Sequence, residues 1–339
     1  MEIWEIILLV AGLYLLVMLL YSLLLYVIIK VKTGKREDEN ELLTYFTVED
    51  YPSLRSEDIR FKNKRDEKLA GKIYFKDNII YNRVILFFPG FGPGHIAYTT
   101  LINDLVMTNE LPVITFDYSG TGASEGKKIR DFLDAVVDAG CLINFLKGQE
   151  EFLNTEFLLI GHSWGGFVAT NLAPLYPFLK IKRIVSLNGV TNFPKMFQHM
   201  TKAPFIFPFV VRGINYLFYK KIAFTTTKRS IKKTTIPHLF IHGQKDDAVP
   251  VYPFVNELMA VNEDEGLVKF HLENTKYHNA YLTLESEQNL RSLQSDLKEL
   301  DKVKFNRPLR EKIMKIDFTK LVENDEIILE RIKTFFTIS

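Results

Sequence analysis

The residue in this sequence best suited to act as a nucleophile is Ser163, at the centre of GHSWGG (residues 161–166). The motif has the form G-x-S-x-G, follows the apolar run FLLIG and precedes the helical run FVATNLAPLY. Where a strand turns this sharply into a helix, the serine takes a strained backbone conformation and a side chain at either flank would clash, so glycines are required. The pattern predicts that Ser163 is raised above the end of a buried strand.

A serine nucleophile needs a base to accept its proton and a carboxylate to orient that base. Two candidate carboxylates, Asp246 and Asp247, occur in HGQKDDAVP (residues 242–250), after an apolar run. Among the seven histidines, His278 in NTKYHNAY lies just beyond the last predicted core strand, where a loop can reach back to the serine. The chain order Ser, Asp, His also matches a known arrangement of such a triad. We expect His278 to be the base and one of the two aspartates to be the acid.

Attack by a serine on a carbonyl carbon also requires donors for the resulting oxyanion. The residue after the nucleophile supplies one backbone N–H, here that of Trp164. The glycine-rich turn PGFGPGH (residues 89–95) follows the apolar run VILFF, and the N–H of Phe91 is the candidate for the second donor. A turn that simply requires glycine conformations would have the same composition.

Six apolar runs that alternate with helical stretches would position these residues. Strands of this kind are buried on both faces, and their alternation with helices implies a mostly parallel sheet with helices on each side. Two earlier segments, IRF and KLAGKIYF, are separated by the polar stretch KNKRDE and predict an antiparallel hairpin at one edge. The six runs are VILFF (84–88), VITFD (113–117), FLLIG (157–161), RIVSL (183–187), HLFIH (238–242) and VKFHL (268–272).

Two stretches interrupt the alternation and are predicted to be insertions. Residues 190–235 are crowded with aromatic side chains and lie between the fourth and fifth core strands, as expected for a cap. Three of its rings, Phe205, Phe207 and Phe209, are expected either to meet an acyl chain or to hold the cap together. Residues 281–320 carry leucines at helical spacing among charged residues, which predicts an amphipathic helix, and the final segment EIILERIKTFF has the period of a closing helix.

The N-terminal segment has the properties of a membrane anchor. Residues 6–29 carry no charge, and a helix of that length is sufficient to cross the hydrocarbon layer. A secretory signal peptide would have a basic leading segment, a shorter apolar stretch and a small-residue cleavage site. Lys and Arg follow the span but do not precede it, which by the positive-inside rule places the remainder in the cytoplasm. We expect a single-pass anchor in the cell membrane at residues 1–30, a charged juxtamembrane linker at 31–58 and a globular domain at 59–339.

Composition argues against several other classes of function. The formal net charge of +2 is too small to predict a polyanionic partner, and no basic stripe is interleaved with aromatics, so nucleic-acid binding is not expected. The single cysteine, Cys141, lies in an apolar run and can form neither an internal disulfide nor a cysteine-based zinc site. Triad chemistry requires no cofactor and no metal. The sequence leaves the oligomeric state open.

The quoted motifs resemble those of the α/β-hydrolase superfamily, particularly its bacterial monoacylglycerol-lipase-like and serine-aminopeptidase-like members, over residues 59–339. The resemblance implies an α/β-hydrolase fold with a helical cap. In that family the loop H-G-x-x-D-x-x-V-P carries the triad acid at its fifth position, which is Asp246 here. FDYSGTGASEG (residues 116–126) is similar to the family's F-D-x-R-G-x-G-x-S-x-G turn, with Ser119 where arginine is usual. Pro89 replaces the common histidine of the family's oxyanion turn.

The resemblance also implies a serine hydrolase that cleaves carboxylic esters through an acyl-enzyme. An aromatic-rich cap and a membrane anchor favour a small-molecule ester with an apolar acyl chain or a lipid-like character, because that chain would be desolvated against the rings. The same triad would serve a peptidase or amidase, or a thioesterase or acyltransferase. A binding module without catalysis is a further alternative, since fold does not fix function, but a complete candidate triad argues against it.

Overall fold

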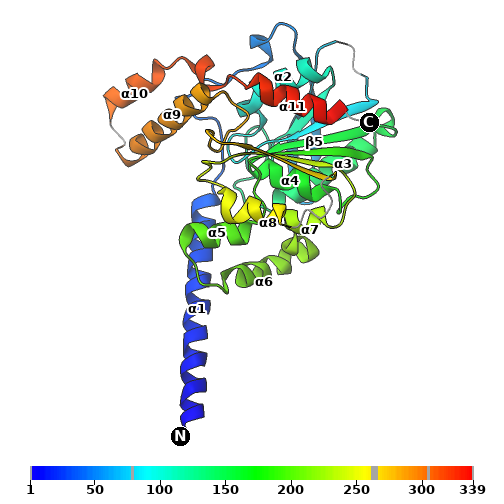
Figure 1. The fold of residues 1–339 in the computed structure, drawn as a ribbon. Helices are drawn as coiled ribbons and strands as arrows, with labels where there is room; N and C mark the ends of the chain where they lie inside the picture. The colour runs from blue at the N-terminus through cyan, green and yellow to red at the C-terminus, as the bar shows by residue number, and fades with distance from the viewer. Residues whose placement is uncertain (1, 78–79, 261–265, 304–305, 338–339) are drawn as a thin grey trace.

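The computed structural model describes residues 2–77, 80–260, 266–303 and 306–337. Most of these residues surround one sheet, whose eight described strands lie in the order β1-β2-β4-β3-β5-β6-β7-β8 (Figure 1). β2 pairs antiparallel with β1 and with β4, and the remaining neighbours pair in parallel. The strands are β1 Arg55–Lys62, β2 Lys68–Phe75, β3 Arg83–Phe88, β4 Val113–Phe116, β5 Glu156–His162, β6 Ile181–Leu187, β7 His238–Gly243 and β8 Val268–Glu273.

The mostly parallel sheet predicted from the sequence is confirmed, and β3 to β8 coincide with the six apolar runs to within two residues at each end. β4 and β7 are buried along their whole length because helices cover both faces of the sheet. Side chains of α3 (Asp134–Lys147) and α4 (Trp164–Leu172) pack on one face. Those of α2 (Thr99–Asn109) and α11 (Glu326–Thr337) pack on the other (Figure 1). The predicted hairpin is formed by β1 and β2.

The cap lies between β6 and β7, on the same side of the sheet as α4 (Figure 1). It consists of α5 (Phe193–Thr201), α6 (Phe207–Tyr219), a 3-10 turn at Lys220–Phe224 and α7 (Thr227–Ile231). The buried side of α6 includes Phe207, Val211 and Asn215. The short helix α8 (Asn256–Met259) follows β7.

The second insertion packs as a small helical unit beside the sheet. It contains α9 (Leu284–Lys302), α10 (Arg307–Met314) and a 3-10 turn at Phe318–Leu321. These elements share an apolar cluster that includes Leu293, Leu300 and Ile313, and Leu42 and Leu43 from the N-terminal part of the chain pack against it. The amphipathic helix predicted within residues 281–320 is therefore present as α9.

Helix α1 (Ile3–Thr33) is long and apolar enough to cross a membrane. Its N-terminal part extends away from the rest of the molecule, whereas its C-terminal part runs along the domain (Figure 1). The hydroxyl of Tyr26 lies 3.2 Å from Oδ1 of Asn215 on α6. Nζ of Lys30 lies 2.6 Å from a carboxylate oxygen of Asp131. Helix α1 is thus attached to the domain by packing as well as by chain connectivity.

The segment after α1, which the sequence suggests is a charged linker, is bound to the domain. Nη1 of Arg36 donates to the carbonyl oxygens of Ser124 and Gly126 at 2.9 and 2.8 Å. The backbone of Glu37 exchanges hydrogen bonds with Gly120 and Gly122. One guanidinium can donate to several carbonyl oxygens at once, as that of Arg36 does here. The charged residues of this segment therefore attach it to the domain, and the segment is not a free linker.

Candidate active site

Ser163 occupies the sharp turn between β5 and α4, with φ 54° and ψ −112°. A Cβ on Gly161 would lie 2.1 Å from the carbonyl oxygen of Gly165, and a Cβ on Gly165 would lie 1.9 Å from the carbonyl oxygen of Phe88. Any side chain at either glycine would therefore collide with backbone atoms. The strained strand-to-helix turn predicted from G-x-S-x-G is present, and it raises the serine hydroxyl from the carboxyl end of β5.

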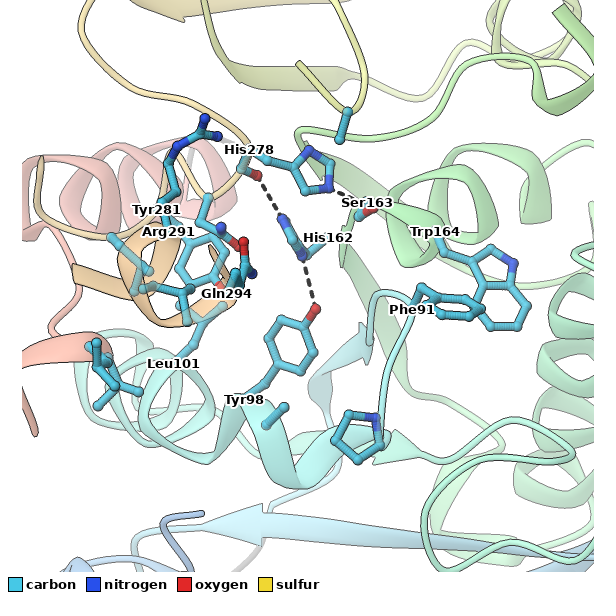
Figure 2. A pocket seen from close by; sticks show the side chains of 18 of the residues that line it. Phe91, Tyr98, Leu101, His162, Ser163, Trp164, His278, Tyr281, Arg291 and Gln294 are labelled. Carbon is cyan, nitrogen blue, oxygen red and sulfur yellow. Dashed lines mark hydrogen bonds between the residues drawn. The ribbon is translucent and has the colours of Figure 1, made fainter. Parts of the chain in front are cut away.

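The structure brings Ser163, His278 and Asp246 together in one hydrogen-bonded chain. Nε2 of His278 lies 2.8 Å from Oγ of Ser163 (Figure 2). Nδ1 of the same ring lies 2.9 and 3.0 Å from the two carboxylate oxygens of Asp246. Asp246 follows β7 and His278 follows β8. The carboxyl ends of these parallel strands meet at one edge of the sheet, which is why residues distant in sequence converge there.

The carboxylate of Asp246 is fully buried and held by several donors. Two backbone N–H groups of its own loop donate to Oδ1 at 2.8 and 2.9 Å, and Nδ2 of Asn188 donates to Oδ2 at 2.8 Å. Burial acts to raise the pKa of Asp246, but hydrogen bonds from His242 and His278 outweigh it and hold the pKa well below its usual range. Asp246 is therefore ionised at neutral pH, the state in which a carboxylate orients an imidazole.

Asp247, the other candidate acid, lies apart from the imidazole. Its side chain is 67% exposed and pairs with Arg291 of α9, whose two terminal nitrogens lie 3.0 and 3.2 Å from the carboxylate oxygens. The Arg291 guanidinium in turn lies 4.0 Å from the ring centre of Tyr277. Of the two aspartates that the sequence offers, only Asp246 contacts His278.

The glycine-rich turn after β3 packs directly against the base of the elbow. The N–H of Gly90 donates to the hydroxyl of Tyr98 at 3.0 Å. The ring of Phe91 lies beside that of Trp164, next to Ser163, with 6.2 Å between ring centres (Figure 2). Within the part of the chain that the structure describes, the backbone N–H groups of Phe91 and Trp164 make no hydrogen bond. Both predicted oxyanion donors are therefore without an internal acceptor.

His162, the neighbour of the serine, links three loops around it. Its Nε2 lies 2.9 Å from the carbonyl oxygen of His278 and its Nδ1 lies 2.9 Å from the hydroxyl of Tyr98 (Figure 2). A carbonyl oxygen can only accept, so Nε2 carries the proton and Nδ1 accepts from the Tyr98 hydroxyl. Burial, together with the nearby His278, lowers the pKa of His162 to about 3. The ring therefore stays neutral at physiological pH and keeps this tautomer.

Arg65 contacts the turn in which Ser119 occupies the position where the family usually has an arginine. Nη2 of Arg65, in the connection between β1 and β2, lies 3.0 Å from Oγ of Ser119. Its Nη1 lies 3.0 Å from Oδ1 of Asp134, and its Nε lies 3.0 Å from Oε2 of Glu67. The sequence departs from the family pattern at 119, but the structure still contains a charged arginine contact at this turn.

A carboxylate on α9 that the sequence analysis missed fixes the loop of His278. Glu287 is completely buried, and its two oxygens accept the backbone N–H groups of Tyr277 at 2.7 Å and Asn279 at 2.6 Å. These are the residues on either side of His278. The only sequence signal is an acidic residue in the first turn of a helix, which is common and equally true of Glu285.

Ser163 and His278 border a cavity of about 840 Å³. Its walls come from α5, from α9 and from residues 43–46 after the anchor helix. None of Phe205, Phe207 and Phe209 lines it: Phe207 is fully buried inside the cap, whereas the other two are 63% and 69% exposed. The expectation that these three rings meet an acyl chain is therefore wrong. The apolar cap residues that do line the cavity are Val190 and, on α5, Phe193, Met196, Phe197 and Met200.

The cavity wall carries few charges. Its Asp, Glu, Lys and Arg side chains within the described residues are Asp247, Arg291 and Lys298, and the first two pair with each other. Across the described parts of the chain, no cluster of three or more His, Cys, Asp or Glu side chains is arranged to hold a metal ion. The chemistry available at this site is that of the hydroxyl, the imidazole and the backbone donors.

The chain is similar in sequence or structure to several known hydrolases. Residues 81–221 match the family model described as serine aminopeptidase, S33. The esterase Pf2001 of Pyrococcus furiosus has a similar structure, with 18% identity, a TM-score of 0.56, and coverage of 78% of this chain and 98% of that chain. Est1E from Butyrivibrio proteoclasticus, solved with ferulic acid bound, has 18% identity, a TM-score of 0.50, and coverage of 67% of this chain and 93% of that one.

The sequence match to the serine aminopeptidase family is confined to residues 81–221, and the structural similarity extends over the larger part of the chain. The chain has the α/β-hydrolase fold and is a serine hydrolase. The family match contains the elbow and the glycine-rich turn, but it ends at 221, before Asp246 and His278. The assignment of these two residues therefore depends on the hydrogen-bond geometry around Ser163.

Proposed function

We propose that this hydrolase cleaves carboxylic esters with apolar acyl chains, with Ser163 as nucleophile, His278 as base and Asp246 as the acid that orients it. The observation that carries the proposal is the 2.8 Å contact between Ser163 and His278 at the wall of a largely apolar cavity. The buried, ionised Asp246 fixes Nδ1 of the imidazole as the donor, which leaves Nε2 free to accept the serine proton.

In the first step, Nε2 of His278 takes the proton from Oγ of Ser163 while Oγ bonds to the ester carbonyl carbon. The N–H groups of Phe91 and Trp164 stabilise the negative charge on the carbonyl oxygen. The alcohol leaves with the proton from the imidazolium, which gives an acyl-enzyme. Water, deprotonated by the same imidazole, then attacks the acyl carbon, and the acid is released with Ser163 restored. No cofactor takes part in these steps.

An apolar acyl group suits the cavity because α5 presents two phenyl rings and two methionine side chains to it. Burying each methylene of an acyl chain against such a wall contributes about 0.8 kcal/mol. Long acyl chains should therefore be preferred over acetyl groups until the cavity is filled.

The family model's description makes a peptidase or amidase the second candidate. An aminopeptidase must bind the charged α-amino group of its substrate, for which a buried or unpaired carboxylate is the usual partner. Among the described residues that line this cavity, the carboxylate is that of Asp247, and it already pairs with Arg291. This pairing favours the ester over the peptide.

A paired substrate series tests the proposal. Wild-type protein and Ser163→Ala would be compared on p-nitrophenyl esters of graded chain length and on p-nitroanilides with the same acyl groups, with fluorophosphonate labelling as a check on the nucleophile. We expect ester turnover that rises with chain length, little anilide turnover, and loss of both turnover and labelling in Ser163→Ala. Full ester activity in Ser163→Ala would refute the nucleophile, and faster anilide turnover would favour the peptidase.

We further propose that α1 anchors the enzyme in the cell membrane with the hydrolase domain in the cytoplasm. The support is the length and apolar character of α1 together with the lysines and arginine that follow it. Carbonate extraction should leave the full-length protein in the membrane fraction. A tag at the C-terminus should be protected from protease in right-side-out vesicles.

A further inference from the structure

The cap helix α6 exposes an apolar face that is not used by the cavity. Phe209, Tyr216 and Leu217 are 69%, 46% and 66% exposed, and with Gly213 they follow the i, i+4, i+7, i+8 spacing of one helix face. Phe205, just before the helix, is 63% exposed. Large apolar side chains gathered in this way on a surface indicate a binding site. We refer to Phe205, Phe209, Tyr216 and Leu217 as the α6 face.

The charged residues of the cap segment itself are of one sign. Residues 190–235 contain nine Lys or Arg and no Asp or Glu. Exposed Lys202 precedes α6, and exposed Lys220 and Lys221 follow it directly. A second copy of the same basic surface would be repelled, whereas an anionic surface would be attracted. An apolar helix face bordered by lysines is the pattern of helices that lie in the interface of an anionic bilayer.

The position of α6 on the anchor helix places this face at the membrane. α1 packs on α6 near Tyr26 and Asn215. Ser22, about one turn earlier in α1, is fully buried. The uncharged stretch, residues 6–29, spans about 36 Å as a helix, and its C-terminal part packs on α6. The hydrocarbon layer is about 30 Å thick. To enclose a full span of α1, the bilayer must therefore extend to the level of α6, which lies nearer the free end of α1 than α5 does (Figure 1).

We propose that the α6 face, together with Lys220 and Lys221, binds the surface of an anionic lipid bilayer and seats the cap in the membrane interface. The apolar side chains enter the boundary between headgroups and acyl chains, and the lysines contact anionic headgroups. The inference rests on the membrane anchoring by α1 that we propose above and does not depend on the hydrolase chemistry.

Site-directed spin labelling of the full chain tests this surface. Single cysteines at Phe209, Leu217, Leu13 and Ile327 would be introduced in a Cys141→Ala background and labelled with a nitroxide. Each protein would be placed, one chain per nanodisc, in phosphatidylcholine with and without phosphatidylglycerol. The ratio of oxygen to nickel-complex collision rates reports depth in the bilayer. Ile327 is the matched control because it is 70% exposed on α11, which covers the opposite face of the sheet (Figure 1).

We expect a ratio several-fold higher at Phe209 and Leu217 than at Ile327 in the discs that contain anionic lipid. The ratio should fall in the neutral discs and in Lys220→Gln/Lys221→Gln, and circular dichroism would show that each variant is folded. Labels at 209 and 217 as water-accessible as the control would overturn the proposal, and a deep Leu13 label would then show that the anchor still spans. Spin–spin broadening at 209 and 217 in a second set of discs that hold several chains each, without depth in the single-chain discs, would identify a second copy as the occupant and overturn the proposal. Equal depth in neutral and anionic discs would refute the role of charge.

Discussion

Replacing Glu287 by glutamine tests whether α9 positions the base. Both carboxylate oxygens accept backbone N–H groups, from Tyr277 at 2.7 Å and from Asn279 at 2.6 Å. Glutamine keeps the size of the side chain and one acceptor oxygen, but it sets an amide donor against one of these N–H donors. The loss of one hydrogen bond to a charged group costs about 1.5–3 kcal/mol. Because Glu287 is completely buried, water does not replace the lost acceptor.

The lost hydrogen bond weakens the attachment of the loop that carries His278, so the imidazole can be displaced. A displacement of about 1 Å at a reacting group can lower a rate by about 100-fold. We expect Glu287→Gln to lower kcat by about 10- to 100-fold with a smaller change in KM, since Glu287 does not line the cavity. Fluorophosphonate labelling of Ser163 should slow by a similar factor, because it depends on the same imidazole.

The control is a variant that destabilises the same insertion without touching the loop. Ile313 on α10 is fully buried in the apolar cluster beneath α9, and truncating such a side chain to alanine costs about 2–5 kcal/mol. Assayed below both unfolding transitions, Ile313→Ala should retain kcat. Unchanged kcat in Glu287→Gln, or an equal loss in Ile313→Ala, would show that the carboxylate contributes only to stability.

Three further outcomes are expected. Asp246→Ala should lower kcat by several orders of magnitude and Asp247→Ala far less, because only the first contacts His278; equal losses would refute this choice of acid. Phe197→Ser should raise KM for long acyl esters more than for acetyl esters, whereas Phe209→Ser in detergent should leave that profile unchanged, and the reverse result would contradict the cavity wall described above. Burial raises the pKa of Asp138 to about 7, so the fold retains a proton that the unfolded chain loses near pH 4. The free energy of unfolding should therefore fall as pH rises from about 4 to 7, and chemical denaturation should show a smaller fall in Asp138→Asn.

The sheet and the elbow could be predicted because their signals are local. A strand buried on both faces must be apolar along its length, so runs such as VILFF and HLFIH mark β3 and β7 almost to the residue. The glycines around Ser163 are required by contacts with neighbouring backbone atoms, and those contacts follow from the turn itself. Loop order along a parallel sheet then limits where the acid and the base can lie.

The direction of the cap side chains could not be predicted without the start of α6. Phe205, Phe207 and Phe209 alternate in sequence, and in a strand they would share one face. α6 begins at Phe207, with Pro208 in its first turn, so residues two apart point to opposite sides of the helix. Phe207 is therefore buried and Phe209 exposed. Glu287 escaped prediction for a different reason, because its role comes from the docking of α9 on the loop of His278.

The segments outside the sheet converge on the candidate active site, and under the proposed anchoring by α1 their attachments determine how the domain sits on the membrane. Residues 43–46, α5 and α9 all contribute to the wall of the cavity. The chain between the anchor and this wall is bound at Lys30, Arg36 and Glu37, so the domain cannot swing on a loose tether. If α1 spans the bilayer as proposed, a site formed in part by residues 43–46 keeps a constant height above it. The fold would then determine which substrates the site can reach, and we expect these to be esters located at the membrane interface.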